Sequence, residues 1–423
     1  MGSVSGMKDI TTVAPPAEDF WHPNSEAFAR DPHSVYARLR ARQAPHYLQG
    51  FGGWVFSRFD DVAALALCPK MVRGAGALMS ADELAVEQRA KNWHDMPAHE
   101  RFVQTNLLES DGPVHRRLRG AVFKVFTRAY VERHRAMIQA YADQMIDAAL
   151  QKGQIDFVRD IAKHMPGHII GTILGVPEED CPQLRIWSEN VVQFFDLGRT
   201  EDDKQVAERA TSEFHLYLID LINDRRRAPK EDLLSILIAA QDAGDLDETE
   251  LIATAMLILM AGHGSTIDVM GSGCHALLTH TDQLAQLRAD PYLTPSAVQE
   301  MFRYDTPLPF FHRYAAEDCD VAGYHMPKGT KVGLLYAAAN RDPIAFPDPD
   351  QFQIARTPNR HLSFGIGAHL CLGNNLSRLD MEVLFNTLLR RTRHITLATE
   401  EVIYKPGLSV RGPIALPVDL TPV

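Results

Sequence analysis

One cysteine stands inside a glycine-rich loop near the C-terminus, in the stretch Phe-Gly-Ile-Gly-Ala-His-Leu-Cys-Leu-Gly at 364–373. Glycine permits tight turns and lets another group approach the main chain closely. Apolar residues recur at helical spacing from Asn374 onward, which places Cys371 at the start of a helix. The free N–H groups and the positive dipole end of a helix lower the pKa of a thiol. The loop is therefore predicted to present a thiolate to a metal.

Two simpler interpretations compete with this one. A lone cysteine between Leu370 and Leu372 is, by composition, a small buried hydrophobic residue. A zinc site would pair His369 with Cys371, but no CxxC or HxxxH pair stands nearby to complete it. The full pattern F-x-x-G-x-x-x-C-x-G, with His369 two residues before the cysteine, is more specific than either. It resembles the haem-binding loop of the cytochrome P450 family, the haem-thiolate monooxygenases.

Further segments resemble the same family in the same order. Asp-Gly-Pro-Val-His-Arg-Arg-Leu-Arg at 111–119 is similar to the segment whose His and Arg bind the haem propionates, with Gly112 in place of a usual proline. An arginine suits this task because its planar guanidinium can bond both carboxylate oxygens. The resemblance implies that haem b is the cofactor, with Cys371 as iron ligand and Phe364 shielding the sulfur. It implies the propionate partners His115, Arg119, Arg313 and His369, and the further haem contacts Ala261, Gly262, Gly365 and Gly373.

A long apolar helix is predicted in the second half of the chain. Asp247 and Glu250 form a capping-box pattern at its start, and it is apolar nearly all round from 251 to 260. Two glycines and two hydroxyls then interrupt it at 261–266, Ala-Gly-His-Gly-Ser-Thr. Each interior glycine costs about 1 kcal/mol relative to alanine. We therefore expect either a packing notch against a neighbouring helix or a widened turn over the haem.

The same segment departs from the family's oxygen-activation pattern, Ala/Gly-Gly-x-Asp/Glu-Thr-Thr/Ser. Gly264 replaces the acid and Ser265 the first threonine, whereas Thr266 matches. Adjacent helical residues point about 100° apart, so His263 cannot share the direction of Ser265. We expect Ser265, Thr266 and Gly264 to form the catalytic segment, with protons arriving through water near Ser265 or through a polar group of the substrate. Room for a bulky substrate is an equally good explanation of Gly264.

Other segments predict structure around the site. Glu300-Met301-Phe302-Arg303 resembles the family's E-x-x-R, a buried pair that stabilises the haem-side core. Residues 72–106 lack periodicity and are predicted to be a long irregular segment, which is typical of a lid or binding loop. Two apolar pairs are candidate walls of the substrate pocket, the first because it resembles the family's mobile roof: Phe194 with Phe195, and Phe310 with Phe311.

Composition bounds the class of protein. The 423 residues are 45% hydrophobic and 23% charged, as in a large globular protein, and the formal net charge of −11 argues against nucleic-acid binding and a basic membrane-surface protein. Five scattered cysteines favour a reducing compartment, so a cytoplasmic location is expected. Residues 1–18 lack a signal-peptide pattern, and the longest apolar run is too short for a membrane anchor.

The expected fold is mainly α with small β-sheets, and haem between the long central helix and the helix after the cysteine. Residues 1–29 are expected to be a flexible N-terminal segment and 30–423 a single catalytic domain. No flavin or dinucleotide fingerprint occurs, so the electrons are expected from a separate ferredoxin and its reductase. A local basic cluster is expected to dock that ferredoxin: Arg116, Arg117, Lys124 and Arg128.

The expected reaction is the O2-dependent oxidation, most simply the hydroxylation, of a small organic substrate. Two alternatives stay open. One is a peroxide-driven or oxidative-coupling enzyme on the same scaffold, which the loss of the acid at Gly264 favours. The other is a haem-thiolate sensor or carrier that binds haem without turnover.

Overall fold

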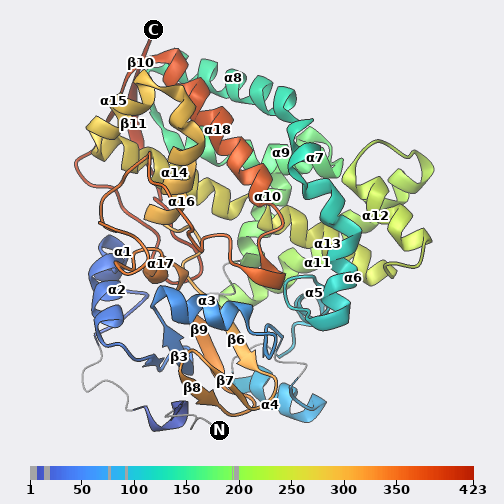
Figure 1. Cartoon of the computed structure of the whole chain (residues 1–423). Coiled ribbons are helices and arrows are strands. Elements are labelled where there is room, and N and C mark those ends of the chain that lie inside the picture. The colour runs from blue at the N-terminus through green and yellow to red at the C-terminus, as the bar shows by residue number, and fades with distance from the viewer. Residues whose placement is uncertain (1–6, 14–19, 75–77, 91–93, 193, 195–199) are drawn as a thin grey trace.

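The computed structural model describes residues 7–13, 20–74, 78–90, 94–192, 194 and 200–423. Helices make up most of the molecule, and the largest sheet lies at one end of it (Figure 1). The α-helices are α1 Glu26–Arg30, α2 Pro32–Ala41, α3 Phe59–Leu67, α4 Ala81–Ala90, α5 Pro97–Thr105, α6 Gly112–Phe123, α7 Arg128–Glu132, α8 Arg135–Lys152, α9 Met165–Leu174, α10 Cys181–Val192, α11 Glu201–Arg227, α12 Leu233–Asp242, α13 Glu248–Ala261, α14 Gly264–Thr279, α15 Thr281–Ala289, α16 Thr294–Tyr304, α17 Tyr336–Ala339 and α18 Asn374–Arg391. The mainly helical expectation is confirmed.

Three small sheets complete the described part of the chain. Their strands are β1 Lys8–Asp9, β2 His46–Leu48, β3 Gly53–Phe56, β4 Met71–Val72, β5 Gln154–Asp156, β6 Phe311–Ala315, β7 Cys319–Val321, β8 Tyr324–Met326, β9 Lys331–Leu334, β10 Thr392–Leu397 and β11 Pro417–Pro422. The five-stranded sheet has the order β2-β3-β9-β6-β4, and the other two have the orders β1-β8-β7 and β10-β11-β5. Strand β6 carries Arg313 from this sheet towards the helices.

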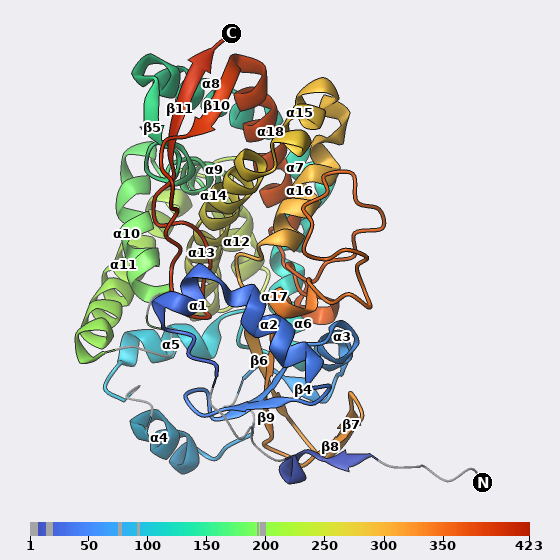
Figure 2. The same ribbon diagram turned by 90° about the vertical axis from the view of Figure 1, so that its left-hand side faces the viewer.

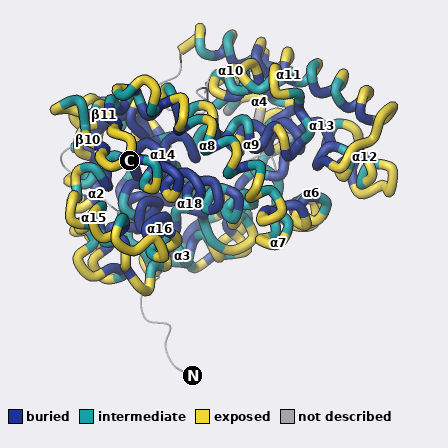
Figure 3. The backbone as a smooth tube through the Cα atoms, turned by 90° about the horizontal axis from the view of Figure 1, so that it is seen from above, coloured by how far each residue is buried: buried dark blue, intermediate teal, exposed yellow. Residues whose placement is uncertain are grey.

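Helices α13 and α14 run through the centre of the molecule, where Figure 3 shows α14 and α18 largely in the colour of buried residues. The predicted capping box is present: Asp247 Oδ1 accepts from the N–H of Glu250 at 2.8 Å, and Glu250 Oε2 accepts from the N–H of Asp247 at 3.0 Å. The stretch Glu248–Thr279 is long and apolar enough to cross a membrane, but 78% of its most apolar window is buried inside the protein. It is the core helix of this fold.

The expectation of a long irregular segment at 72–106 was wrong, because α4 and α5 lie within it. Helix α4 consists mostly of good helix formers without an apolar stripe, so its periodicity is weak. A local signal was present all the same. The Ser80 hydroxyl accepts from the N–H of Glu83, and the Glu83 carboxylate accepts from the N–H of Ser80, which is the capping-box arrangement.

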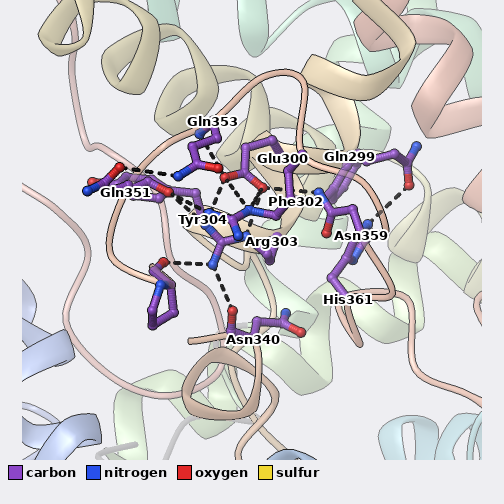
Figure 4. A network of polar contacts seen from close by, with 12 residues as sticks. Gln299, Glu300, Phe302, Arg303, Tyr304, Asn340, Gln351, Gln353, Asn359 and His361 are labelled. Carbon is purple, nitrogen blue, oxygen red and sulfur yellow. Dashed lines mark hydrogen bonds and ion pairs between the residues drawn. The ribbon is translucent and has the colours of Figure 1, made fainter. Parts of the chain in front are cut away.

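A buried polar network fixes the chain that leads to the cysteine loop (Figure 4). Glu300 and Arg303 of α16 are both 0% exposed and form two N–H···O bonds of 2.8 Å each. Arg356 donates to the same carboxylate at 3.1 Å. Arg303 also donates to the carbonyl of Asn340 at 2.9 Å, and the Asn340 side chain accepts from the N–H of Leu362 at 2.6 Å. The predicted buried pair is therefore the centre of a larger network.

Replacing Glu300 with Gln leaves two buried guanidinium groups without a carboxylate. Because an uncompensated buried charge is costly, we expect the free energy of unfolding to fall by about 3–5 kcal/mol. Urea unfolding followed by circular dichroism measures this change. The control is Asp224→Asn, which removes an exposed ion pair with Arg227 and should cost less than about 1 kcal/mol. Equal, small losses in both variants would contradict the role given to Glu300.

Candidate functional site

The cysteine loop is held in one shape by its own backbone. The N–H of Cys371 donates to the carbonyl of Phe364 at 2.8 Å, which closes the loop. Gly365 and Gly367 have φ of +67° and +76°, a region that favours glycine. A side chain at Gly367 would also meet Leu67 of α3 at 3.1 Å. Helix α18 begins at Asn374, so the cysteine precedes the helix as the sequence predicted.

Opposing effects act on the pKa of Cys371. Protein surrounds the sulfur closely enough that burial raises the pKa of the thiol, although the residue faces open space and counts as exposed. The N–H groups of Gly373 and Asn374 and the charges of Arg378 and Arg119 lower the pKa. Without a metal, burial outweighs these groups, which act in the direction that the sequence predicts. A bound cation such as iron is what holds a thiolate in such a site.

Cationic side chains gather above the loop from three separate parts of the chain. His115 and Arg119 come from α6, Arg313 from β6, and His369 from the cysteine loop itself. The rings of His115 and His369 lie 4.3 Å apart, and Arg119 donates to the carbonyl of Leu370 at 2.7 Å. His369 Nε2 lies 3.1 Å from Asp111 Oδ1, which orients its ring. The four predicted propionate partners thus converge beside Cys371.

This cluster is short of negative charge. Arg313 is buried, and within the described ranges no carboxylate lies at ion-pair distance from it or from Arg119. Burial, followed by the charge of Arg73, lowers the pKa of Arg313 to about 10. Burial likewise lowers the pKa of His115 to about 4, and the Nε2 atom of His115 is buried with no hydrogen-bond partner. The cluster therefore fits a ligand that brings carboxylates, as the two propionates of haem would.

The central helix faces the same space. Ala261 is exposed although residues 251–260 before it are all buried, and Ser265, one turn later, is partly exposed. The two residues lie on either side of the junction between α13 and α14, so the central helix is accessible at that junction. The helix is divided here, since His263 has a φ of −124° between α13 and α14. This matches the interruption that the glycines predicted.

The surroundings of the two glycines in this segment differ. A Cβ at Gly262 would lie 2.7 Å from the Ile170 side chain of α9, so packing against α9 explains this glycine, and its contact with haem stays a prediction. A Cβ at Gly264 would meet no atom within 4 Å, so no neighbouring helix requires that glycine. His263 turns away, with Nδ1 2.9 Å from the carbonyl of Leu259. The Thr266 hydroxyl lies 3.1 Å from that of Ser377 on α18, which leaves Ser265 as the hydroxyl on the exposed face.

Three of the four predicted pocket phenylalanines lie within the described residues. Phe194 is fully buried beside Met96 and Ala207, with its ring 5.3 Å from that of His99, as a core residue would be. Phe195 lies outside the described residues. Phe310 packs edge-on against Phe51, and Phe311 packs near the ring of Tyr336. Both are partly exposed, so the structure leaves their pocket role a prediction.

Sequence reasoning missed two residues that shape the site. Arg73 is buried, pairs with Glu109 and donates to the carbonyl of His312 at 3.2 Å, next to Arg313. Asp111 accepts from the N–H groups of Arg73 and Gly74 as well as contacting His369. Arg73 lies within residues 72–106, which lack periodicity, so the sequence gives no pattern that indicates its role. Asp111 was part of the matched segment, but its partners are distant in sequence.

Comparisons with known proteins agree with this geometry. The sequence pattern of the family described as Cytochrome P450 matches residues 54–413. Polyketide biosynthesis cytochrome P450 PksS of Bacillus subtilis is 32% identical, over 95% of this chain and 98% of PksS. Cytochrome P450 monooxygenase PikC of Streptomyces venezuelae is 35% identical, over 96% of this chain and 95% of PikC. The structure of the cytochrome P450 enzyme CxnD for C–S bond formation in chuangxinmycin biosynthesis superposes with a TM-score of 0.85 at 35% identity, covering 97% of this chain and 99% of that chain.

Members of this family bind haem b through a cysteine thiolate, and the cysteine loop, the cationic cluster and the divided central helix are in place for it. The chain belongs to the cytochrome P450 family and is a haem-dependent oxidoreductase of the monooxygenase kind.

Proposed function

We propose that this enzyme hydroxylates a small organic substrate in the cytoplasm, using O2 and electrons from a separate ferredoxin and ferredoxin reductase. The observation that carries the proposal is the position of Cys371 directly before α18, with His115, His369 and Arg119 gathered beside its loop. When bound, haem supplies the oxygen-activating iron, and a thiolate ligand favours O–O cleavage. The similarity to PksS and PikC supports a small organic molecule as substrate and the monooxygenase reaction.

The protein's own residues bind and orient. The Cys371 sulfur would hold the iron, with the N–H groups of Gly373 and Asn374 stabilising its charge. Arg119, Arg313, His115 and His369 would bind the two propionates and so set the plane of the ring. A screen of compounds for shifts of the haem Soret band, followed by mass analysis of products, tests the substrate class.

Replacing Cys371 with His tests the iron ligand. We expect the ferrous carbon monoxide complex of the wild type to show the red-shifted Soret band of thiolate ligation, and the variant to lose it while still binding haem. The absorption spectrum of the reduced protein under carbon monoxide measures this. Cys68→Ser is the control, since Cys68 lies on another part of the chain and should keep the band. A band that survives in the Cys371 variant would refute the assignment.

One member of the predicted basic cluster, Arg117, already has a partner within the protein. Arg117 is not free to dock a partner, because its guanidinium donates to both carboxylate oxygens of Glu250 at 2.6 and 2.7 Å. Arg116, Lys124 and Arg128 remain exposed, as does the side chain of Phe123 in the same stretch. The Asn375 side chain donates to the carbonyl of Phe126 at 2.9 Å, which ties this stretch to the helix after Cys371. Exposed cations and an exposed apolar side chain in one stretch suit an acidic redox protein.

Charge reversal at Arg116 and Lys124 should slow reduction by an acidic ferredoxin, because electrostatic steering sets the association rate. We expect the reduction rate in stopped flow to fall by about tenfold at low salt, with the difference shrinking as salt screens the charges. Lys328→Glu, on the exposed β8–β9 turn, is the matched control and should change little. Rates that depend on neither salt nor the double substitution would rule out docking at this surface.

A second candidate function is supported by Gly264 and by the similarity to CxnD, which is named for C–S bond formation. In an oxidative-coupling or peroxide-driven enzyme the acid of the oxygen-activation segment is less important. Turnover with a ferredoxin and its reductase, compared with turnover in hydrogen peroxide alone, separates the two candidates.

Ser265→Ala tests the hydroxyl on the exposed helix face. If protons reach the bound oxygen through this hydroxyl, the variant should release hydrogen peroxide at the expense of product, by about tenfold or more, while substrate affinity is kept. Product and peroxide formed per electron pair measure the coupling, and Soret titration measures the affinity. Thr266→Ser, which keeps the hydroxyl that contacts Ser377, is the control. Full coupling in Ser265→Ala would favour the second candidate.

A further inference from the structure

A buried carboxylate lies one turn beyond the missing acid. Asp268 of α14 has a side chain that is 2% exposed, and its Oδ1 lies 2.6 Å from the Nζ of Lys405. The Lys405 side chain is 35% exposed, so this ion pair links the interior of α14 to the protein surface. Lys405 belongs to the C-terminal hairpin, which we define as residues 403–414. Figure 2 shows this red segment running beside α14.

The hairpin is pressed against Asp268. Tyr404 pairs with Pro413, and the N–H of Lys405 donates to the carbonyl of Gly412 at 3.0 Å. A Cβ at Gly412 would lie 2.4 Å from Asp268 Oδ1, so only glycine lets the hairpin backbone come this close. The hairpin backbone therefore packs directly on Asp268 and holds Lys405 beside its carboxyl group.

Helix geometry directs Asp268 towards Gly264. Residues four apart lie on one helix face, and helical side chains lean towards the N-terminus, so Asp268 leans over the turn that begins at Gly264. The space where a Gly264 side chain would lie is open to 4 Å. Ser265, the partly exposed hydroxyl beside that space, is three residues before Asp268.

We propose that Asp268 is the displaced acid of this enzyme: Lys405 and Asp268 form a proton path from the surface, which reaches the Ser265 hydroxyl through water beside Gly264. The inference rests on the proposed function, since it describes how protons enter that reaction. Asp268 acts through Ser265 and not on the reacting atoms, so it is a positioning and relay residue.

The transfers balance. Asp268 takes a proton from the Lys405 ammonium, which is recharged from solvent, and gives it to the water beside Gly264. The water gives a proton to Ser265, and Ser265 gives its own to the oxygen being reduced. Two such passages, with two electrons from the redox partner, convert O2 and substrate into hydroxylated product and one water.

The surroundings of Asp268 suit a group that holds and releases a proton. The charged groups that act on it from the neighbouring elements are Lys405 of the hairpin, Asp305 after α16 and Glu189 of α10. Burial raises the pKa of Asp268 and exceeds the opposing effect of Lys405. His263 is not on this path, because its ring bonds to the Leu259 carbonyl of its own helix.

The competing explanation is that the contact between Asp268 and Lys405 only stabilises the packing of the hairpin on α14. The variants below separate this stabilising role from proton transfer. Asp268→Asn keeps the shape and a carbonyl acceptor for Lys405 but cannot relay a proton as a carboxyl. Adding Gly264→Glu to it puts an acid at the open position, where the side chain has room and a favourable place at a helix start. Asp232→Asn is the control, since it weakens another buried ion pair, with Arg225 at 2.9 Å, in a different helix.

The experiment uses the haem-loaded enzyme with ferredoxin, its reductase and a substrate found by Soret shift. We expect Asp268→Asn to slow the proton-dependent step by about 100-fold, with more peroxide, a larger solvent deuterium isotope effect and a shifted pH profile, at unchanged substrate affinity. Gly264→Glu in the same chain should restore coupling, and Asp232→Asn should leave it unchanged. Infrared difference spectra of the resting enzyme should show a protonated carboxyl band that titrates with pH and is lost in Asp268→Asn.

The inference would be overturned if Asp268→Asn formed as much product per electron pair as the wild type. It would also be overturned if product formation fell in Asp268→Asn and Gly264→Glu did not restore it. In either case the contact between Asp268 and Lys405 would serve only to join the hairpin to the helix. Failure of the proposed function looks different: the wild type itself would form no product from donor electrons, while the infrared titration would be unaffected.

Discussion

The burial of the Glu300 carboxylate constrains everything on the cysteine side of the molecule. A carboxylate with no exposure is tolerated only when cations and donors satisfy it, and Glu300 has Arg303, Arg356 and the Asn359 amide as partners. Those partners in turn hold the chain between α17 and α18. Through Asn340, the network sets Leu362 two residues before Phe364, whose carbonyl receives the N–H of Cys371. The position of the sulfur is therefore decided at a site remote from the chemistry.

The parts of this site that the sequence could predict are those encoded by neighbours in the chain. The cysteine loop depends on residues within ten positions, and the capping box at Asp247 on residues three apart. Contacts between residues far apart in the sequence leave no local pattern by which they could be predicted. The sequence places Arg117 in a surface basic cluster because its partner Glu250 lies 133 positions away, and it gives no signal for Arg73, whose stretch has no periodicity. Asp268 and Lys405 are 137 positions apart, and each alone is an ordinary charged residue.

The two glycines of the central helix show why residue type alone is ambiguous. Both break a helix at similar cost, and both match positions at which the family's pattern has a meaning. The three-dimensional structure shows the difference: a side chain at Gly262 would clash with Ile170, whereas a Cβ at Gly264 would contact no neighbouring atom. Packing explains one glycine, whereas the other, two positions later, stands beside open space.

The gathering of Arg313, Arg119, His115 and His369 has a thermodynamic consequence for how this protein matures. Arg313 is held in a poorly solvated interior near the charge of Arg73, so the folded polypeptide by itself bears the cost of desolvating and crowding that charge. A dicarboxylate ligand relieves it only once the chain is folded, because the four side chains come from three distant segments. Ligand affinity and folding free energy are then linked, and each increment of binding adds to the stability of the folded form. The supply of haem in the cell thereby becomes one of the variables that determine how much folded enzyme exists.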